Sequence, residues 1–366
     1  MFRIGRGHRP DYFLLTLIFV LTIAGLVILS SASAELGKKN FNDSYYYLKH
    51  QILYGLSFGI AGFVAAYLIN YKFLKKLALP GLILAIGFLA MVFTKFGFAA
   101  QGASRWVRIG PATFQPAEFL KLALIVYIAA WLTNSKMNRS RDFSSGLFPL
   151  LVICGVVAGL LFLQPATSTV VILMLSGGIV YFLEGAKWSH MLGAAVLGLA
   201  ILILIVSFTG YRMNRIKSFL NPNDDVLGSN FQRNQALSTI SSGNLWGEGY
   251  GASTKKYSLP EPIGDSIFAV AAGEFGFVGS GALVVLFGLL VFRLIWIAKN
   301  LRDRFGQLML IGFASLIALQ SLVNMAAISG IIPLTGVPLP FISYGGTALM
   351  VFLTMGGIAV NVSKYS

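Results

Sequence analysis

The chain has 366 residues, of which 56% are hydrophobic and 11% charged, with a mean hydropathy of +0.77 and a formal net charge of +15. Soluble proteins carry about a quarter charged residues, so this composition indicates an integral membrane protein. No stretch has the composition of a separate soluble domain, and we expect a single membrane domain over residues 1–366. The basic residues lie in short clusters between apolar runs, which favours a role in topology over nucleic-acid binding.

The apolar segments predict an all-α polytopic fold with about ten transmembrane helices. Each segment approaches the ~20 residues that a helix needs to cross a bilayer. The first run lacks a small-residue cleavage site, so we expect a retained span and not a removed signal peptide. The expected spans are 12–30, 51–70, 77–94, 118–133, 147–163, 167–183, 190–208, 266–292, 308–328 and 341–361.

The charged connectors set the expected orientation. An even number of spans places both termini on one side, and the basic clusters on that side predict that both termini are cytoplasmic. These clusters are Arg3/Arg6/Arg9, Lys72/Lys75/Lys76, Lys136/Arg139/Arg141, Lys187 and Lys299/Arg302/Arg304.

Longer connectors are then expected on the outer side, at 31–50, 95–117, 209–265 and 329–340. The connector 209–265, between the seventh and eighth spans, is the only one with room for an extramembrane substrate platform. Loops of this length are usually functional or disordered. An apolar helical pattern around Ala236 to Ile240 predicts a short interfacial helix within it.

Asp265 stands where this connector meets the eighth span. The turn before it, Leu259 to Gly264, contains two prolines and a glycine, and an apolar run follows from Ile267. One interpretation is that Asp265 only caps the helix. The other is a partly desolvated carboxylate whose pKa is raised enough for it to act as a general base.

Glu118 and Lys121 stand at i and i+3 at the start of the fourth span, just after Gln115-Pro116. This spacing places both on one helix face, where they can pair and reduce each other's desolvation cost. They are either a structural ion pair within the membrane or the wall of a polar cavity that receives a phosphate. The two interpretations are compatible.

Several other groups are expected at the membrane surface. Trp106 and Arg108 suit an aromatic anchor and a headgroup contact, whereas Arg105 could fork onto a pyrophosphate. The run Gly247 to Gly251 could offer N–H groups to an anion, although a simple turn is the commoner explanation. Ser343 and Tyr344 put hydroxyls at the depth of Asp265.

The remaining candidate ligands predict no metal or disulfide chemistry. The histidines His8, His50 and His190 show no ligand spacing. Cys154 is the single cysteine and lies in an apolar run, so it can form no intrachain disulfide.

Four motifs in order resemble the SEDS family (shape, elongation, division and sporulation), over nearly the whole chain. They are Arg105-Trp106, Gln115-Pro116-x-Glu118-x-x-Lys121, Leu259-Pro260-Glu261 with Asp265-x-x-Phe268, and Pro338-Leu339-Pro340-Phe341-Ile342-Ser343-Tyr344-Gly345-Gly346.

The resemblance implies a SEDS fold of ten spans and a peptidoglycan glycosyltransferase that polymerises lipid II on the outer face of the bacterial cytoplasmic membrane. It implies Asp265 as the catalytic residue, a divalent cation (Mg²⁺ or Mn²⁺) with no organic cofactor, and no assigned metal ligand. Expected partners are lipid II, a class B penicillin-binding protein and other membrane proteins of the division machinery. The expected substrate-binding residues are Arg105, Gln115, Glu118, Lys121, Glu261, Ser343 and Tyr344.

Within the family, part of the long connector resembles the division branch, typified by FtsW, more than the elongation branch, typified by RodA. The segments concerned are Tyr211-Arg212-x-x-Arg215 and Phe219 to Pro222. The chain departs from the family pattern in three places. Ala166 stands where an acid is usual, Gly273 where the first of two acids is common, and Gly264 where threonine is frequent.

Two functions from other classes compete with polymerisation. A lipid II flippase would also use many spans and a charged cavity, but it needs polar groups through the whole bilayer depth. Only Glu118 and Lys121 are expected clearly inside, which favours catalysis at the surface. The third alternative is a scaffold that recruits a transpeptidase.

Overall fold

The computed structural model describes residues 8–100, 103–110, 112–134, 139–221 and 230–366. The basic residues Arg3, Arg6 and Lys136 used in the topology prediction lie outside these ranges.

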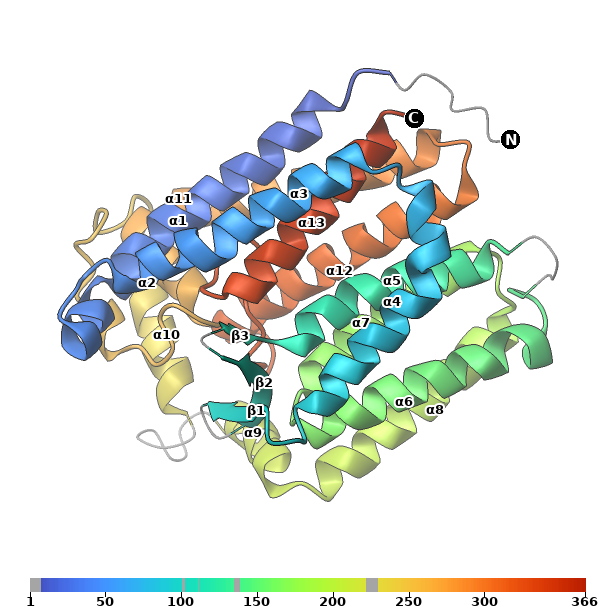
Figure 1. Ribbon diagram of the computed structural model, residues 1–366. Coiled ribbons are helices and arrows are strands. Elements are labelled where there is room, and N and C mark those ends of the chain that lie inside the picture. Colours follow the sequence, from blue (N-terminus) through green and yellow to red (C-terminus); the bar gives the residue numbers. More distant parts are fainter. Residues whose placement is uncertain (1–7, 101–102, 111, 135–138, 222–229) are drawn as a thin grey trace.

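The described chain is a bundle of membrane-length helices, which confirms the predicted polytopic helical fold (Figure 1). Eight of its helical segments are long and apolar enough to cross a membrane, and two further helices of 17 residues, α5 and α7, fill the remaining expected positions. The bounds are α1 Tyr12–Phe41, α2 Tyr46–His50 continuing through η1 Gln51–Leu56 and α3 Ser57–Leu68, α4 Lys72–Met91, α5 Pro116–Leu132, η2 Phe143–Leu147 with α6 Phe148–Leu163, α7 Thr167–Leu183, α8 Trp188–Ser207, α11 Ile267–Asn300, α12 Arg304–Ile328 and α13 Gly346–Ser363.

The long connector after α8 contains helices. They are α9, Gly210–Leu220, α10, Phe231–Ser242, and the short 3₁₀ helix η3, Lys255–Ser258. Helix α10 covers the segment where a short helix was predicted.

One expected connector was wrong in its bounds, and a second contains a sheet that was not predicted. Helix α1 continues to Phe41, well past residue 30, and ends at Asn42 in the left-handed conformation with Lys38 and Lys39 in its last turn. Lysines there complement the carbonyl end of the helix dipole, so a polar sequence can still be helical. The connector 95–117 forms an antiparallel sheet of β1 Gly97–Ala100, β2 Ala103–Ile109 and β3 Ala112–Phe114, and the protein is therefore not purely α-helical.

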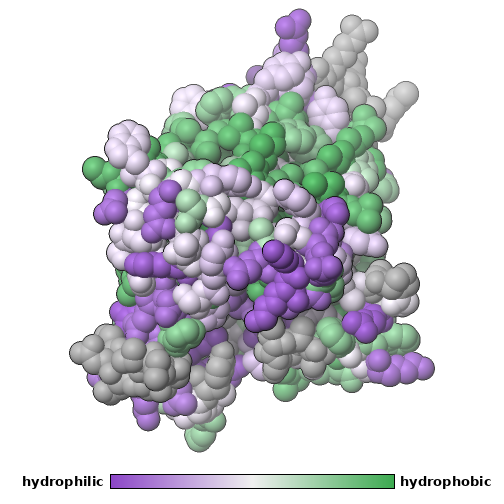
Figure 2. Space-filling model, turned by 90° about the vertical axis from the view of Figure 1, so that its left-hand side faces the viewer, coloured by the Kyte–Doolittle hydropathy of each residue, from purple (hydrophilic) through white to green (hydrophobic). Residues whose placement is uncertain are grey.

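The beginning of α1 and the end of α13 meet at one end of the bundle. The backbone N–H of His8 donates to the Lys364 carbonyl oxygen at 2.8 Å, and that of Asp11 donates to the Ser363 hydroxyl at 3.0 Å. The sheet, α2 and α10 lie at the opposite end (Figure 1). Figure 2 shows hydrophilic residues gathered at the height of α10 and the sheet, with hydrophobic residues above them.

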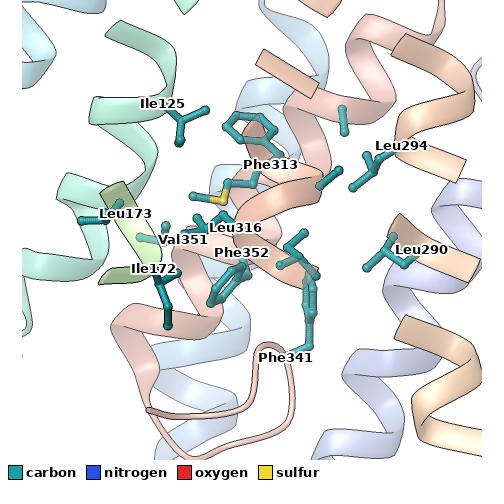
Figure 3. Packing of buried hydrophobic residues seen from close by; sticks show 14 of the residues in the cluster. Ile125, Ile172, Leu173, Leu290, Leu294, Phe313, Leu316, Phe341, Val351 and Phe352 are labelled. Carbon is teal, nitrogen blue, oxygen red and sulfur yellow. The ribbon is translucent and has the colours of Figure 1, made fainter. Parts of the chain in front are cut away.

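The apolar core surrounds α12 and α13. Side chains from α5, α7 and α11 converge on Phe313 and Leu316 of α12, with Phe352 of α13 beside them (Figure 3). Helix α8 has no buried residue, so its apolar side chains are left for lipid. The most buried of the candidate spans are thus α12 and α13, at the centre of the bundle.

Helix α11 is kinked at Gly276, which has φ 67° and ψ −164°. A residue with positive φ inside a helix interrupts the ladder of backbone hydrogen bonds. The segment 244–249 replaces the lost bonds: the N–H groups of Glu248 and Gly249 donate to the carbonyls of Gly273 and Glu274, at 3.0 Å each. The glycine-rich run 247–251 is thus a turn packed against α11, and these two N–H groups are not available to an anion.

Candidate active site

Asp265 lies one residue before the N-cap of α11. The N-cap residue is Ser266, and the carboxylate of Asp265 accepts a hydrogen bond from the Gln232 side-chain amide of α10, Nε2 to Oδ1, at 3.2 Å. The same amide nitrogen reaches the Ser266 hydroxyl at 3.1 Å. Asp265 is thus held by α10 and not used as the helix cap, which removes the simplest structural explanation for an acid here.

The surroundings raise the pKa of Asp265 to about 6, from an ordinary value of 3.8. Burial is the main cause, because it disfavours the charged form, and the nearby negative charge of Glu261 acts in the same direction. The hydrogen bond from Gln232 and the positive charge of Arg215 oppose the shift. A carboxyl group with a pKa near 6 is ionised at neutral pH and is a stronger base than an ordinary aspartate.

The segment before Asp265 is tied to the loop that precedes α13. The Ser343 hydroxyl donates to the Gly264 carbonyl oxygen at 2.6 Å and accepts from the Leu339 N–H at 2.8 Å. The Tyr344 backbone N–H donates to the Ile263 carbonyl oxygen at 2.8 Å. These bonds join residues about 80 positions apart in sequence and bring the two motifs to one place.

The Tyr344 hydroxyl has a different neighbour. It lies 2.9 Å from Nδ1 of His50, and the Tyr344 ring packs edge-on against Tyr47 of α2. The backbone of Tyr344 thus supports the Asp265 segment, while its side chain belongs to an aromatic cluster on α2.

Helix α12 holds the same region from within the bundle. The side-chain amide nitrogen of Asn324 donates to the backbone carbonyl of Asp265 at 2.7 Å and to that of Val337 at 2.8 Å. One turn earlier, the amide nitrogen of Gln320 donates to the Pro338 carbonyl at 2.9 Å. Both side chains are buried.

Glu118 and Lys121 form an ion pair of 2.8 Å between Oε1 and Nζ, and each residue is only 2% exposed. Lys121 also donates to Oε1 of Gln320 at 2.9 Å. The second oxygen of Glu118 is buried without a hydrogen-bond partner among the described residues. Through Gln320, the pair is therefore connected to α12 and to the backbone carbonyl of Pro338.

Arg105 and Gln115 hold other parts of the end of the bundle opposite the termini (Figure 1). Arg105 of β2 donates through Nε to the Gln164 carbonyl at 3.0 Å and through a terminal nitrogen to the Pro165 carbonyl. The Arg105 guanidinium, considered above as an anion ligand, thus binds backbone carbonyls of the turn between α6 and α7. Gln115 is the N-cap of α5, and its N–H donates to the Thr347 hydroxyl at 3.3 Å.

Arg215 of α9 lies on the same side of the site as Asp265. A Cβ atom placed on Gly336 would be 3.8 Å from Oδ2 of Asp265 and 4.0 Å from both terminal nitrogens of Arg215. Arg215 also donates to the Leu334 carbonyl at 2.9 Å. A guanidinium and a carboxylate thus flank one glycine of the loop before α13.

A second buried ion pair supports the long connector. Lys256 and Glu274 are 2.6 Å apart, and the Ser31 hydroxyl of α1 joins them. Glu274 is the retained member of the two-acid pattern. The missing acid is explained by packing, since a Cβ atom at Gly273 would already lie 3.1 Å from two atoms of Thr239 on α10.

Comparison with known proteins agrees with the motifs. Residues 12–366 match the FtsW/RodA/SpoVE family, described as "Cell cycle protein". The chain belongs to this family. A curated relative named "Probable peptidoglycan glycosyltransferase FtsW" from Trichlorobacter lovleyi is 35% identical over 355 residues, covering 96% of this chain and 93% of the relative. "Stage V sporulation protein E" from Bacillus subtilis is 34% identical over 361 residues, with 98% of each covered.

Solved structures of the family share the fold. A chain from a structure described as "Structural coordination of polymerization and crosslinking by a peptidoglycan synthase complex" gives a TM-score of 0.80 at 28% identity, with 98% of this chain and 99% of the other covered. The crystal structure of RodA from Thermus thermophilus gives 0.71 at 27% identity, with 97% and 96% covered.

Some residues of this family member were not singled out from the sequence. Gln320 and Asn324 are polar residues four apart in an apolar span, and that pattern alone marks one helix face as unusual. Gln232 and Lys256 lie in the long connector and carry no such signal, because a polar residue in a polar loop is ordinary. Arg215 was noticed only as part of the motif Tyr211-Arg212-x-x-Arg215, without a role at the site.

Proposed function

We propose that the protein polymerises lipid II into glycan strands, as a peptidoglycan glycosyltransferase. The observation that carries the proposal is Asp265, a partly buried carboxylate with a raised pKa, held by two helices at the end of the bundle opposite the termini. The names of its curated relatives support the same activity.

In the proposed reaction, Asp265 acts as general base. A sugar hydroxyl of the acceptor attacks the anomeric carbon of the lipid-linked donor, and the new carbon–oxygen bond forms as the bond to the pyrophosphate breaks. The hydroxyl proton passes to the Asp265 carboxylate, and the pyrophosphate leaves on its lipid. General-base catalysis of this kind contributes typically 10²–10⁴-fold to a rate.

Arg215 is the cation that we assign to the leaving pyrophosphate. Its guanidinium and the Asp265 carboxylate face the same glycine, Gly336, so both can lie beside one reacting centre. Guanidinium groups bind phosphate oxygens in a bidentate manner. Lys121 is a weaker candidate, because it is only 2% exposed and its charge is already paired with that of Glu118.

A divalent cation, Mg²⁺ or Mn²⁺, remains part of the proposal as an aid to pyrophosphate departure. The described residues bring together no group of three or more histidine, cysteine, aspartate or glutamate side chains that could hold a metal ion. Such a cation does not fit a cage made by the described protein residues alone, and no step proposed here depends on it.

We place the protein in the bacterial cytoplasmic membrane with both termini in the cytoplasm and Asp265 outside. The contact between the beginning of α1 and the end of α13 supports a common side for the termini. A class B penicillin-binding protein is the proposed partner, together with other membrane proteins of the division machinery. The similarity to a chain of a complex that coordinates polymerisation and crosslinking supports such a partner.

A division role is favoured over an elongation role. The curated relatives at 34–36% identity include several named FtsW, and the loop text around Arg212 and Arg215 points in the same direction. A RodA-type elongation polymerase is the alternative within the family, and a lipid II flippase is the alternative outside it.

The test is purified protein, alone and with its penicillin-binding partner, supplied with lipid II. The wild type is expected to make glycan polymer, and Asp265→Asn is expected to make none. Asp43→Asn is the matched control, because Asp43 is an acid of another outer connector, paired on the surface with Lys49. Polymer from Asp265→Asn would refute the mechanism, and lipid II translocation without polymer by the wild type would indicate the flippase.

A further inference from the structure

Two hydrogen-bonded branches connect α5 with the Asp265 segment through α12. Lys121 donates to Gln320, and Gln320 donates to the Pro338 carbonyl. One turn further along α12, Asn324 donates to the neighbouring carbonyl of Val337 and to that of Asp265. Adjacent residues of a single backbone segment, 337 and 338, are thus held by two amides four residues apart on one helix face.

The donor and acceptor chemistry allows one arrangement. An ammonium group only donates and a backbone carbonyl only accepts, so the Gln320 amide must turn its oxygen to Lys121 and its nitrogen to Pro338. The nitrogen of Asn324 likewise faces two carbonyls, which leaves its oxygen buried without a partner in the described structure. The charge of Lys121 therefore fixes the orientation of Gln320.

The position of this network argues against contact with substrate. Gln320 is 0% exposed, Asn324 1%, and Glu118 and Lys121 2% each. The ammonium of Lys121 also has Phe352 of α13 nearby, with the ring centre 5.7 Å from Nζ. A buried charge needs a compensating partner, and Glu118 provides it.

We propose that the Glu118–Lys121 pair is a positioning element for Asp265, acting through Gln320 and Asn324 of α12, and that it does not itself touch substrate. The inference rests on the proposed role of Asp265 as general base. The pair orients Gln320, and the side chains of Gln320 and Asn324 hold the 337–338 backbone. Asn324 also holds Asp265 directly, by a hydrogen bond to the backbone carbonyl of Asp265. The loop so held also carries Ser343, which bonds the residue before Asp265.

The kinetic consequence differs from that of a binding site. Misplacing a catalytic group by about 1 Å can cost on the order of 10²-fold in rate. We therefore expect Gln320→Met to lower kcat about tenfold or more, with the KM for lipid II changed by less than about twofold. The neutral pair Glu118→Gln with Lys121→Met is expected to behave in the same way. Ser321→Ala is the control, because among the described residues that buried hydroxyl bonds only to carbonyls of α12 itself.

The combined variant separates the two roles. If the pair acts through Gln320, adding Gln320→Met to the neutral pair lowers kcat no further than either change alone. If the pair binds pyrophosphate, the neutral pair raises KM, its effect multiplies with that of Gln320→Met, and the proposal is wrong. Size-exclusion chromatography and melting temperature establish that each variant is folded.

Asn324→Ser provides a test that leaves the ion pair intact. The carboxylate of Asp265 is faced by Glu261 from its own segment, Arg215 from α9 and Gln232 from α10, so a shift of its backbone changes its distance to each. The midpoint of the pH–rate profile is expected to move in Asn324→Ser and to stay in Ser321→Ala. An unchanged midpoint together with an unchanged kcat overturns the proposal, whereas loss of polymer in Asp265→Asn tests the function separately.

Discussion

The ammonium of Lys256 and the carboxylate of Glu274 are 2.6 Å apart and almost completely buried, with side-chain exposures of 3% and 0%. They join the 3₁₀ helix η3, a few residues before Asp265, to the N-terminal part of α11. Ser31 of α1 donates to the same oxygen of Glu274 at 2.5 Å. Three segments distant in sequence thus meet at one carboxylate.

Glu274→Gln is expected to destabilise the protein strongly. Removing one partner of a buried pair leaves the other charge uncompensated, at a cost of about 3–5 kcal/mol. Thermal unfolding in detergent measures the effect. The double variant Lys256→Met with Glu274→Leu is expected to recover much of the loss, and a double variant less stable than Glu274→Gln would contradict this explanation.

Polymerisation is expected to rise with pH through about 6 and then level off. A general base acts in its ionised form, and the pKa of Asp265 is raised to about 6. Because the charge of Glu261 contributes to this rise, Glu261→Gln is expected to lower the midpoint. The measurement is kcat/KM for lipid II between pH 5 and 8, and a midpoint that moves upward in Glu261→Gln would be inconsistent with the assignment.

Asp265→Asn is expected to be inactive but more stable than the wild type at pH 8. The folded protein holds the Asp265 proton more tightly than the unfolded chain does, so wild-type stability falls as pH rises from about 4 through about 6. Asparagine carries no charge and escapes this loss. The melting temperatures of the wild type and Asp265→Asn should therefore diverge as pH rises from about 4 through about 6. Parallel curves would show that burial does not destabilise the ionised carboxylate.

Ala166→Asp is expected to stabilise the protein. Ala166 is the N-cap of α7 and makes no side-chain cap bond, while Arg105 binds the carbonyls of the two preceding residues. An aspartate at an N-cap is worth about 0.5–2 kcal/mol relative to alanine. Ala166→Asn isolates the capping contribution, and the difference in melting temperature between the two variants reports the attraction of Arg105.

Gly276→Ala is expected to destabilise α11. Its φ of 67° disfavours any side chain, and a Cβ atom would lie 2.3 Å from the Gly247 nitrogen. Gly288→Ala, in the same helix with no atom within 4 Å of the added Cβ, is the control and should be neutral or slightly stabilising. Equal melting temperatures for the two variants would show that the kink is not required.

The spans were predictable because hydrophobic length is a property of a local segment. The place of Asp265 at the beginning of a span did not by itself decide its role, because Asp11 and Asp303 are N-caps of α1 and α12. The resemblance of the surrounding motif to the SEDS family singled it out. The sheet at β1–β3 was not, because strands of three to seven residues leave a weak signal. The amides of Gln320 and Asn324 show why the site was only partly predictable: their polar character is visible in the sequence, but their partners are set by packing between α5, α12 and the loop before α13.

Arg105 and Lys121 illustrate the limit from the other side. Arg105 was considered for a pyrophosphate because a guanidinium can fork onto one, and Lys121 as the cation of a polar cavity wall. The structure gives each of them protein acceptors. A sequence supplies the charge of a residue but not the number of carbonyl oxygens that surround it.

The kink at Gly276 makes the N-terminal part of α11 dependent on the connector that precedes it. A helix in a bilayer normally forms all of its backbone hydrogen bonds within itself. Here the carbonyls of Gly273 and Glu274 instead accept hydrogen bonds from the N–H groups of Glu248 and Gly249. The backbone of α11 at the kink is therefore fully hydrogen-bonded only when the connector is docked against it. A chain in which the connector has not docked would leave these two carbonyls of α11 without their hydrogen-bond donors.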